Sequence, residues 1–118
     1  MSELAYSLYQ KGLKLLKLNR PGQAILFLEE AKSLEPGKGS IREALARSYY
    51  NCRRFDLARE HFEKAIEIDP TNDYAYFGLG LCLAKQGDIA KAAGHIKMAL
   101  AMKPGNSVYQ RALDKIQY

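Results

Sequence analysis

Cysteine is scarce in this chain of 118 residues. Its two cysteines, Cys52 and Cys82, are too few for a disulfide framework, and they do not have the spacing of metal ligands. A reduced cysteine usually behaves as a small apolar side chain in a protein core. We therefore expect two buried thiols, with no disulfide-stabilised fold and no metal site.

Long apolar runs and basic leader segments are also lacking. No stretch approaches the roughly 20 apolar residues that a membrane-spanning helix needs. The N-terminal segment carries Glu3 where a secretory signal would carry basic residues. Since 47% of the residues are hydrophobic and 26% are charged, the composition is that of a globular domain. We expect a cytoplasmic chain without a membrane partner, provided that no export signal has been removed.

The net charge of +5 lies in the first half of the chain. Residues 1–59 hold 11 Lys and Arg against 6 Asp and Glu, whereas residues 60–118 hold 7 of each kind. This excess mildly favours an acidic partner near the N-terminal half. There is no Lys/Arg block of the length found in nucleic-acid-binding tails.

No alternating strand pattern is present, but the chain repeats itself. Pro36, Pro70 and Pro104 are spaced 34 residues apart, and each follows a similar helix-like segment, such as FEKAIEID before Pro70. A fixed period of 20–50 residues is typical of solenoid architectures. The three repeats, called units one to three below, are residues 5–38, 39–72 and 73–106.

Side-chain size follows the same period. With each unit numbered from 1 to 34, positions 8, 20 and 27 hold Gly or Ala, and position 24 holds Leu, Phe or Ile. Small residues let two helices approach closely, and bulky residues fill the space beside them. Apolar residues also recur at three- and four-residue steps, which is helical periodicity. The pattern predicts two closely crossing helices in each unit.

The segments between the two predicted helices are LNRPG, CRRFD and KQGDI. Pro21 suits the first turn of a helix, Gly87 suits a left-handed C-terminal cap, and Asp88 can cap the following helix. Arg53 occupies the position of Gly87 in unit two. Because residues other than glycine rarely adopt the left-handed backbone conformation, we expect strain at Arg53.

Each unit resembles the tetratricopeptide repeat, so that the chain holds three such repeats in tandem. The resemblance rests on a small residue at position 8, alanines at positions 20 and 27, a bulky residue at position 24 and proline at position 32. Leu45 with Ala46, and Leu79 with Gly80, match the family's signature in the first helix of a unit. The usual tryptophan at position 4 is replaced in all three units. The resemblance covers residues 5–106 and implies an all-α, right-handed α-solenoid.

The ends of the array carry their own signals. The resemblance implies that positions 7 and 10 face the preceding unit, and in unit one these are Lys11 and Lys14, which can face water. After unit three, Tyr109, Leu113 and Ile116 can cover the last unit. The residues that would face a further helix are polar, and they are Gln110, Asp114 and Gln117. We expect a capping helix over 107–118, seven helices in total and a single domain, 1–118, that could be the entire protein.

Catalytic and cofactor motifs are not convincing in this sequence. FGLGLCLAKQG has Gly78 and Gly80 but has Leu83 at the place of the third glycine of a dinucleotide fingerprint, and no strand precedes it. His61 and His95 occupy position 23 of successive units, too far apart to share a metal ion. We expect no enzyme activity, no cofactor and no metal.

In the fold that the resemblance implies, the first helices of the units line a concave groove. Positions 2, 5, 9 and 12 point into it, with position 6 beside them. Aromatic residues there offer a large contact area with few rotatable bonds, and an exposed apolar stripe often marks an interaction site. The alternative is that the rings pack on one another and bind nothing. The predicted peptide-binding residues are Tyr6, Tyr9, Leu13, Glu43, Arg47, Tyr50, Tyr74, Phe77, Gly78, Leu81 and Arg111.

Gly78 is unusual because glycine inside a helix costs about 1 kcal/mol relative to alanine. One explanation is that the backbone or a ring of a ligand approaches it closely beside Phe77. This hypothesis predicts that Gly78→Ala raises the thermal stability and weakens binding.

The family's carboxylate clamp holds the acidic C-terminal tail of heat-shock chaperones with Lys, Asn and Arg at five groove positions. In this chain none of the five matches, and the residues there are Tyr9, Leu13, Ala44, Tyr74 and Gly78. The sequence therefore argues against that partner. Arg47 and Arg111 remain available to bind a single carboxylate.

The resemblance predicts a protein–protein interaction module, with an adaptor or small chaperone-like role, that binds an apolar or aromatic segment in the groove. An alternative is a structural module that forms a homodimer through the groove or the capping helix. Nucleic-acid binding is a weaker third possibility, because the aromatic residues and most of the arginines lie in different places.

Overall fold

The computed structural model describes residues 1–116, and these form an all-α array of seven helices. The helices are α1 (Glu3–Lys17), α2 (Pro21–Leu34), α3 (Gly39–Asn51), α4 (Phe55–Ile68), α5 (Asp73–Lys85), α6 (Ile89–Met102) and α7 (Ser107–Ile116). The predicted fold class and the number of helices are confirmed. Gln117, which the sequence places on the capping helix, lies outside the described residues.

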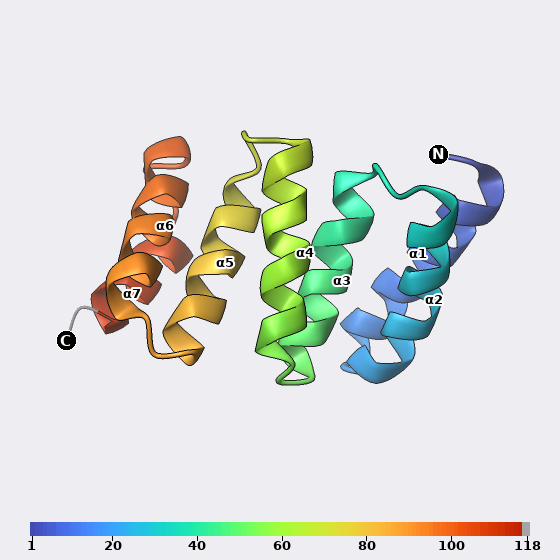
Figure 1. Cartoon of the computed structure of the whole chain (residues 1–118), viewed down its shortest axis with the longest axis horizontal. Helices are drawn as coiled ribbons and strands as arrows, with labels where there is room; N and C mark the ends of the chain where they lie inside the picture. The colour runs from blue at the N-terminus through green and yellow to red at the C-terminus, as the bar shows by residue number, and fades with distance from the viewer. Residues whose placement is uncertain (117–118) are drawn as a thin grey trace.

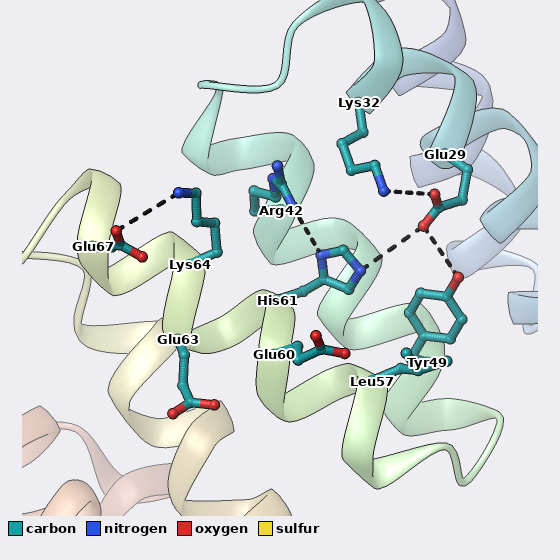
Figure 2. A pocket seen from close by; sticks show the side chains of 10 residues that line it. All are labelled: Glu29, Lys32, Arg42, Tyr49, Leu57, Glu60, His61, Glu63, Lys64 and Glu67. Atoms are coloured by element: carbon teal, nitrogen blue, oxygen red, sulfur yellow. Dashed lines mark hydrogen bonds and ion pairs between the residues drawn. The ribbon is translucent and has the colours of Figure 1, made fainter.

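The helices stand side by side along a body of 44 × 25 × 22 Å, with the two termini at opposite ends (Figure 1). α1 packs on α2, α3 on α4 and α5 on α6, and each pair contacts the next through α2–α3, α4–α5 and α6–α7. The first helices also contact one another, α1 with α3 and α3 with α5. Polar contacts join units one and two, where Glu29 lies between Tyr49 and His61 (Figure 2). No helix within 1–116 is both long and apolar enough to cross a membrane.

The turn inside each unit uses one left-handed residue at the same position. Asn19, Arg53 and Gly87 have φ angles of 58°, 61° and 90°, and they are 34 residues apart. This result confirms the predicted cap at Gly87 and the strained conformation of Arg53. Pro21 begins α2, and Asp88 caps α6 by accepting a hydrogen bond from the backbone N–H of Lys91 at 3.2 Å.

The core confirms the predicted alternation of side-chain size. The alanines at positions 20 and 27 of all three units are completely buried. A methyl group added to Gly12 would lie 2.6 Å from Cδ2 of Leu28, and one added to Gly80 would lie 2.6 Å from Cγ1 of Ile96. Both distances are much shorter than a van der Waals contact, so the first and second helices cross as closely as glycine allows.

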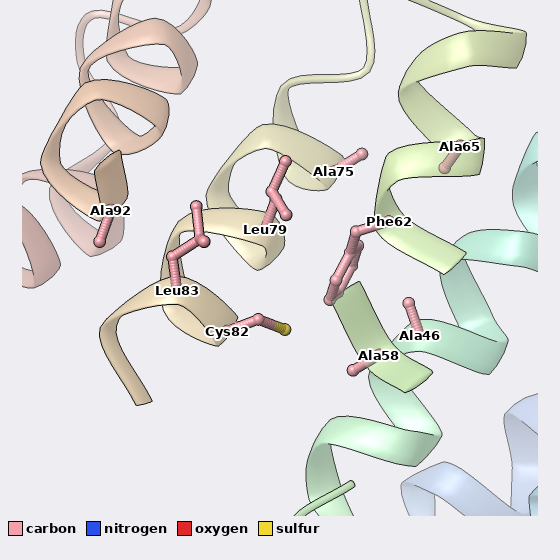
Figure 3. Packing of buried hydrophobic residues seen from close by; sticks show 9 residues of the cluster. All are labelled: Ala46, Ala58, Phe62, Ala65, Ala75, Leu79, Cys82, Leu83 and Ala92. Carbon is pink, nitrogen blue, oxygen red and sulfur yellow. The ribbon is translucent and has the colours of Figure 1, made fainter. Parts of the chain in front are cut away.

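The structure corrects the prediction for Gly78, which is buried and does not face a ligand. Phe62 projects from α4 into the space between α4 and α5 (Figure 3), and its ring would overlap any methyl group on Gly78. The equivalent position of unit two is Ala44, which shares its cluster with the smaller Leu28. Gly78 is therefore explained by the size of Phe62 in the adjacent unit.

The two cysteines are both free thiols. Cys82 is completely buried in the cluster around Phe62, and burial raises the pKa of its thiol to about 12. Cys52, at the end of α3, is only partly buried. The expectation of buried thiols thus holds fully for Cys82 and in part for Cys52.

Gly78→Ala should lower the free energy of unfolding by about 1–3 kcal/mol, since the new methyl group and the Phe62 ring cannot both keep their places. Gly94→Ala is the matched control, because Gly94 also lies inside a helix but has no atom within 4 Å of an added methyl group. It should raise the stability by up to about 1 kcal/mol through helix propensity alone. Urea denaturation of both variants tests this, and a Gly78→Ala variant as stable as the wild type would contradict it.

Candidate functional site

The first helices and α7 carry most of the predicted binding residues at the surface. Nine of the eleven are exposed or partly exposed in the structure, and these are Tyr6, Tyr9, Leu13, Glu43, Arg47, Tyr50, Tyr74, Leu81 and Arg111. The other two, Phe77 and Gly78, are buried. Most of the predicted binding residues are therefore accessible to solvent, whereas two of them belong to the core.

Phe77 is buried because α7 covers it. Only 8% of Phe77 is exposed, and its ring stacks on the ring of Tyr109 with the centroids 4.6 Å apart. The hydroxyl of Tyr109 donates a hydrogen bond to Oδ2 of Asp73 at 2.6 Å. Burial, together with that carboxylate, raises the pKa of Tyr109 well above its usual range. The prediction that Phe77 is an open aromatic anchor is therefore wrong, and its ring holds the capping helix in place.

The half of the groove formed by α1, α3 and the start of α5 combines tyrosines with charged residues. Burial raises the pKa values of Tyr9 and Tyr74, and Glu43 and Arg47 are close enough to influence both hydroxyls. Oε2 of Glu43 accepts a hydrogen bond from the side chain of Asn72 at 2.9 Å. In this half of the groove, Glu43 therefore already has a hydrogen-bond partner within the chain.

The other half of the groove contains an apolar cleft of about 550 Å³ between α3, α5, α6 and α7. Its apolar walls are formed by Tyr50, Leu81, Ala84, Ile89, Ala112 and Ile116. Lys85 and Lys115 complete the lining, and no Asp or Glu lines it. We call this region the apolar cleft.

Only Tyr50 and Leu81 of the apolar cleft belong to the predicted binding residues. Ile116 was expected to cover unit three, and it does pack against the core while also reaching the cleft. Ile89, the first residue of α6, was missed because positions on the second helix were not considered for the groove. The ring of Tyr50 is fixed by an edge-on contact with Phe55, with centroids 5.2 Å apart.

A second, more polar pocket of about 670 Å³ lies between α2, α3 and α4 (Figure 2). Oε1 of Glu29 accepts a hydrogen bond from the Tyr49 hydroxyl at 3.1 Å and lies 3.8 Å from Nε2 of His61. The other ring nitrogen of His61 lies 3.5 Å from Nη1 of Arg42, and Lys32 pairs with Glu29 at 2.8 Å. The sequence prediction compared His61 only with His95 and missed this network, which links units one and two.

The polar network changes the acid–base properties of its members. Burial lowers the pKa of His61, and the nearby charges of Lys32 and Arg42 lower it further, while Glu29 opposes them. Burial alone would raise the pKa of Glu29, but Lys32, Tyr49 and His61 together lower it below its usual value. No Ser, Thr or Cys lines this pocket.

The sequence model of the tetratricopeptide repeat (TPR) matches residues 9–73 and, in a second overlapping match, residues 43–107. The chain belongs to the tetratricopeptide repeat family. TPR domains are protein- and peptide-binding modules, and the helix pairs of this chain are TPR units.

Two curated relatives share part of this TPR array. Interferon-induced protein with tetratricopeptide repeats 2 of Cricetulus griseus is 36% identical over 74 residues, which cover 61% of this chain and 16% of that protein. DnaJ protein P58IPK homolog B of Oryza sativa subsp. japonica is 32% identical over an alignment of 118 positions, covering 81% of this chain and 24% of that protein. The chain thus spans less than a quarter of the length of either relative.

Among solved structures, the first TPR of Spaghetti (RPAP3) bound to the HSP90 peptide SRMEEVD superposes on this chain with a TM-score of 0.94. The match has 21% sequence identity and covers 99% of this chain and 93% of that chain. At this identity, the similarity supports the fold of three TPR units with a seventh helix.

Acidification should destabilise the protein through His61. An unfolded histidine titrates near pH 6.5, and the folded pKa of His61 is lower, so below about pH 6.5 the unfolded state binds a proton that the folded state does not. Stability should therefore be lost as the pH falls from about 7.5 to about 5. In His61→Gln this part of the loss should disappear.

Urea denaturation between those pH values measures the effect. Glu29, whose pKa is lowered in the folded protein, contributes mainly below the ordinary pKa of a glutamate, about 4.3, and so mainly below this pH range. His95→Gln makes the same substitution at the equivalent position of unit three, outside the network, and is the matched control. An unchanged pH dependence in His61→Gln would show that the network does not hold His61 in its neutral form.

Proposed function

We propose that this TPR array acts as an adaptor or small chaperone-like module that holds an apolar or aromatic segment of a partner protein in the groove lined by α1, α3, α5 and α7. The observation that carries the proposal is the apolar cleft, which is open to solvent and lies beside exposed groove residues. A concave apolar site of about 300–1,000 Å³ is the usual size of a ligand-binding pocket. We place the module in the cytoplasm, in keeping with its two free thiols.

The partner we propose is different from a chaperone tail held in a carboxylate clamp. The first TPR of Spaghetti (RPAP3), which has the same fold, is bound to an HSP90 peptide. In this chain, none of the five clamp positions carries a cation. Two of them, Ala44 and Gly78, are buried and cannot reach a ligand. Affinity would instead come from apolar burial in the cleft and along the tyrosines of the groove.

The proposal predicts that peptides selected from a display library will bind the groove and lose affinity when the cleft is changed. Leu81→Glu should weaken such peptides by about tenfold or more, because it places a charge among apolar walls. Leu26→Glu is the matched control, since Leu26 is 70% exposed on α2, outside the groove. Binding is measured by fluorescence anisotropy and located by NMR chemical-shift changes. Peptides that bind the α2, α4 and α6 face would contradict the proposal.

The alternative function is self-association through the groove or through α7. The mass of the protein in solution distinguishes it from the proposed function. Light scattering over a wide range of protein concentration should show a monomer if the groove is open for another protein. A concentration-dependent dimer that Leu81→Glu returns to a monomer would show that the groove binds a second copy of the chain.

A further inference from the structure

We propose that the apolar cleft selects a partner segment in which carboxylates flank an apolar side chain, and that α7 is part of this binding site in addition to capping the solenoid. The inference rests on the proposed function, because it names the chemistry of the partner at one end of the same groove. It assigns roles to Lys85 and Lys115, which are not among the eleven predicted binding residues.

The cleft owes its depth to two alanines. Ala84 on α5 and Ala112 on α7 face the space that Tyr50, Leu81 and Ile89 surround. Tyr50 occupies in unit two the position that Ala84 occupies in unit three, so the larger side chain is present in one unit and missing in the next. A leucine or phenylalanine side chain from outside can take the place that a larger residue would have filled, and its burial there is favourable.

The rim of the cleft is positively charged. Lys85 lies at the end of α5 and Lys115 lies on α7, so a ligand in the cleft would contact two cationic side chains. Within residues 1–116, neither lysine lies within 4 Å of a carboxylate oxygen. Arg53, whose charge influences Tyr50, adds to the positive field on that side.

This positive charge is local to the apolar cleft, and it favours a negatively charged ligand. The polar pocket between α2, α3 and α4 is lined by four glutamates together with basic residues, whereas the apolar cleft has lysines alone as its charged groups. Charge complementarity at the rim of an interface attracts oppositely charged segments and discourages segments of the same charge. Carboxylates next to the apolar anchor are therefore the complement of this site, and lysines or arginines there would be repelled.

One wall of the cleft comes from α7. Ala112, Lys115 and Ile116 reach the cleft from this helix, and its position is fixed by Tyr109, which stacks on Phe77 and donates a hydrogen bond to Asp73. A helix that served only to cover unit three would need its apolar face toward the core and nothing more. In this chain α7 also presents a lysine and the edge of an isoleucine to the groove.

The inference is tested with two labelled peptides that share an apolar centre and differ in charge, GDLFELDG and GKLFKLKG, by fluorescence anisotropy at low salt. The acidic peptide should bind about tenfold tighter, since each exposed ion pair contributes up to about fivefold, and high salt should reduce the difference. The double variant Lys85→Glu/Lys115→Glu should reverse the preference. Lys97→Glu/Lys103→Glu is the matched control, because it makes the same charge change on α6 and at its C-cap, outside the cleft, and should leave the preference unchanged.

A third variant tests the apolar part of the site. Ala84→Leu should fill the cleft and weaken the acidic peptide by about tenfold, and a urea midpoint close to that of the wild type shows that the variant is folded. If that variant is unstable, Ala112→Leu makes the same change from α7. The proposal would be overturned if a folded variant with the filled cleft bound the acidic peptide with full affinity. It would also be overturned if the two peptides bound equally, or if Lys85→Glu/Lys115→Glu kept the preference for the acidic peptide.

The same experiments distinguish this inference from the proposed function. If neither charged peptide binds but display-selected peptides perturb the Tyr6 and Tyr9 end of the groove, the proposed function stands and this inference is wrong. If no peptide perturbs the groove, both are wrong. A dimer that buries the apolar cleft would also overturn the inference, because its occupant would then be a second copy of the chain.

Discussion

In each unit of this solenoid, one bulky side chain of the second helix occupies space that a glycine or alanine of the first helix leaves open. Leu28 lies against Gly12 and Ile96 against Gly80, at distances that an added methyl group would make impossible. Phe62 is larger than either residue and reaches beyond its own unit to Gly78. Because the helices can approach so closely, each unit presents a complementary surface to the next, and the array is held together by contacts between neighbours alone.

The binding surface is a consequence of this arrangement. The core uses one side of α1, α3 and α5. The opposite side carries side chains that are exposed or partly exposed, among them Tyr6, Tyr9 and Leu81. At the C-terminal end the chain gives up part of this surface, since α7 covers Phe77 by stacking Tyr109 on it. The same helix then forms a wall of the apolar cleft, so covering one aromatic residue creates a new edge of the groove.

The sequence was enough to predict the fold because the 34-residue period, the small positions and the left-handed turn residues are all local properties of the chain. It was less informative about the site. A position in the repeat gives the direction of a side chain but not the size of its neighbours on adjacent helices, and for this reason Gly78 and Phe77 were assigned to the groove. The apolar cleft depends on Ala84 and Ala112 being small next to Ile89, a combination of three helices that no single motif contains. The pair of Glu29 and His61 likewise joins two different units.

The reactivity of the two cysteines can report how often units two and three separate in the native protein. Cys82 lies in the cluster between units two and three, where its thiol cannot ionise at neutral pH, whereas Cys52 is partly open to solvent at the end of α3. An alkylating reagent reacts with thiolates that it can reach. The reagent would therefore modify Cys52 directly, but it would reach Cys82 only while units two and three are separated. The ratio of the two modification rates would measure how often the junction between these units opens in the native protein.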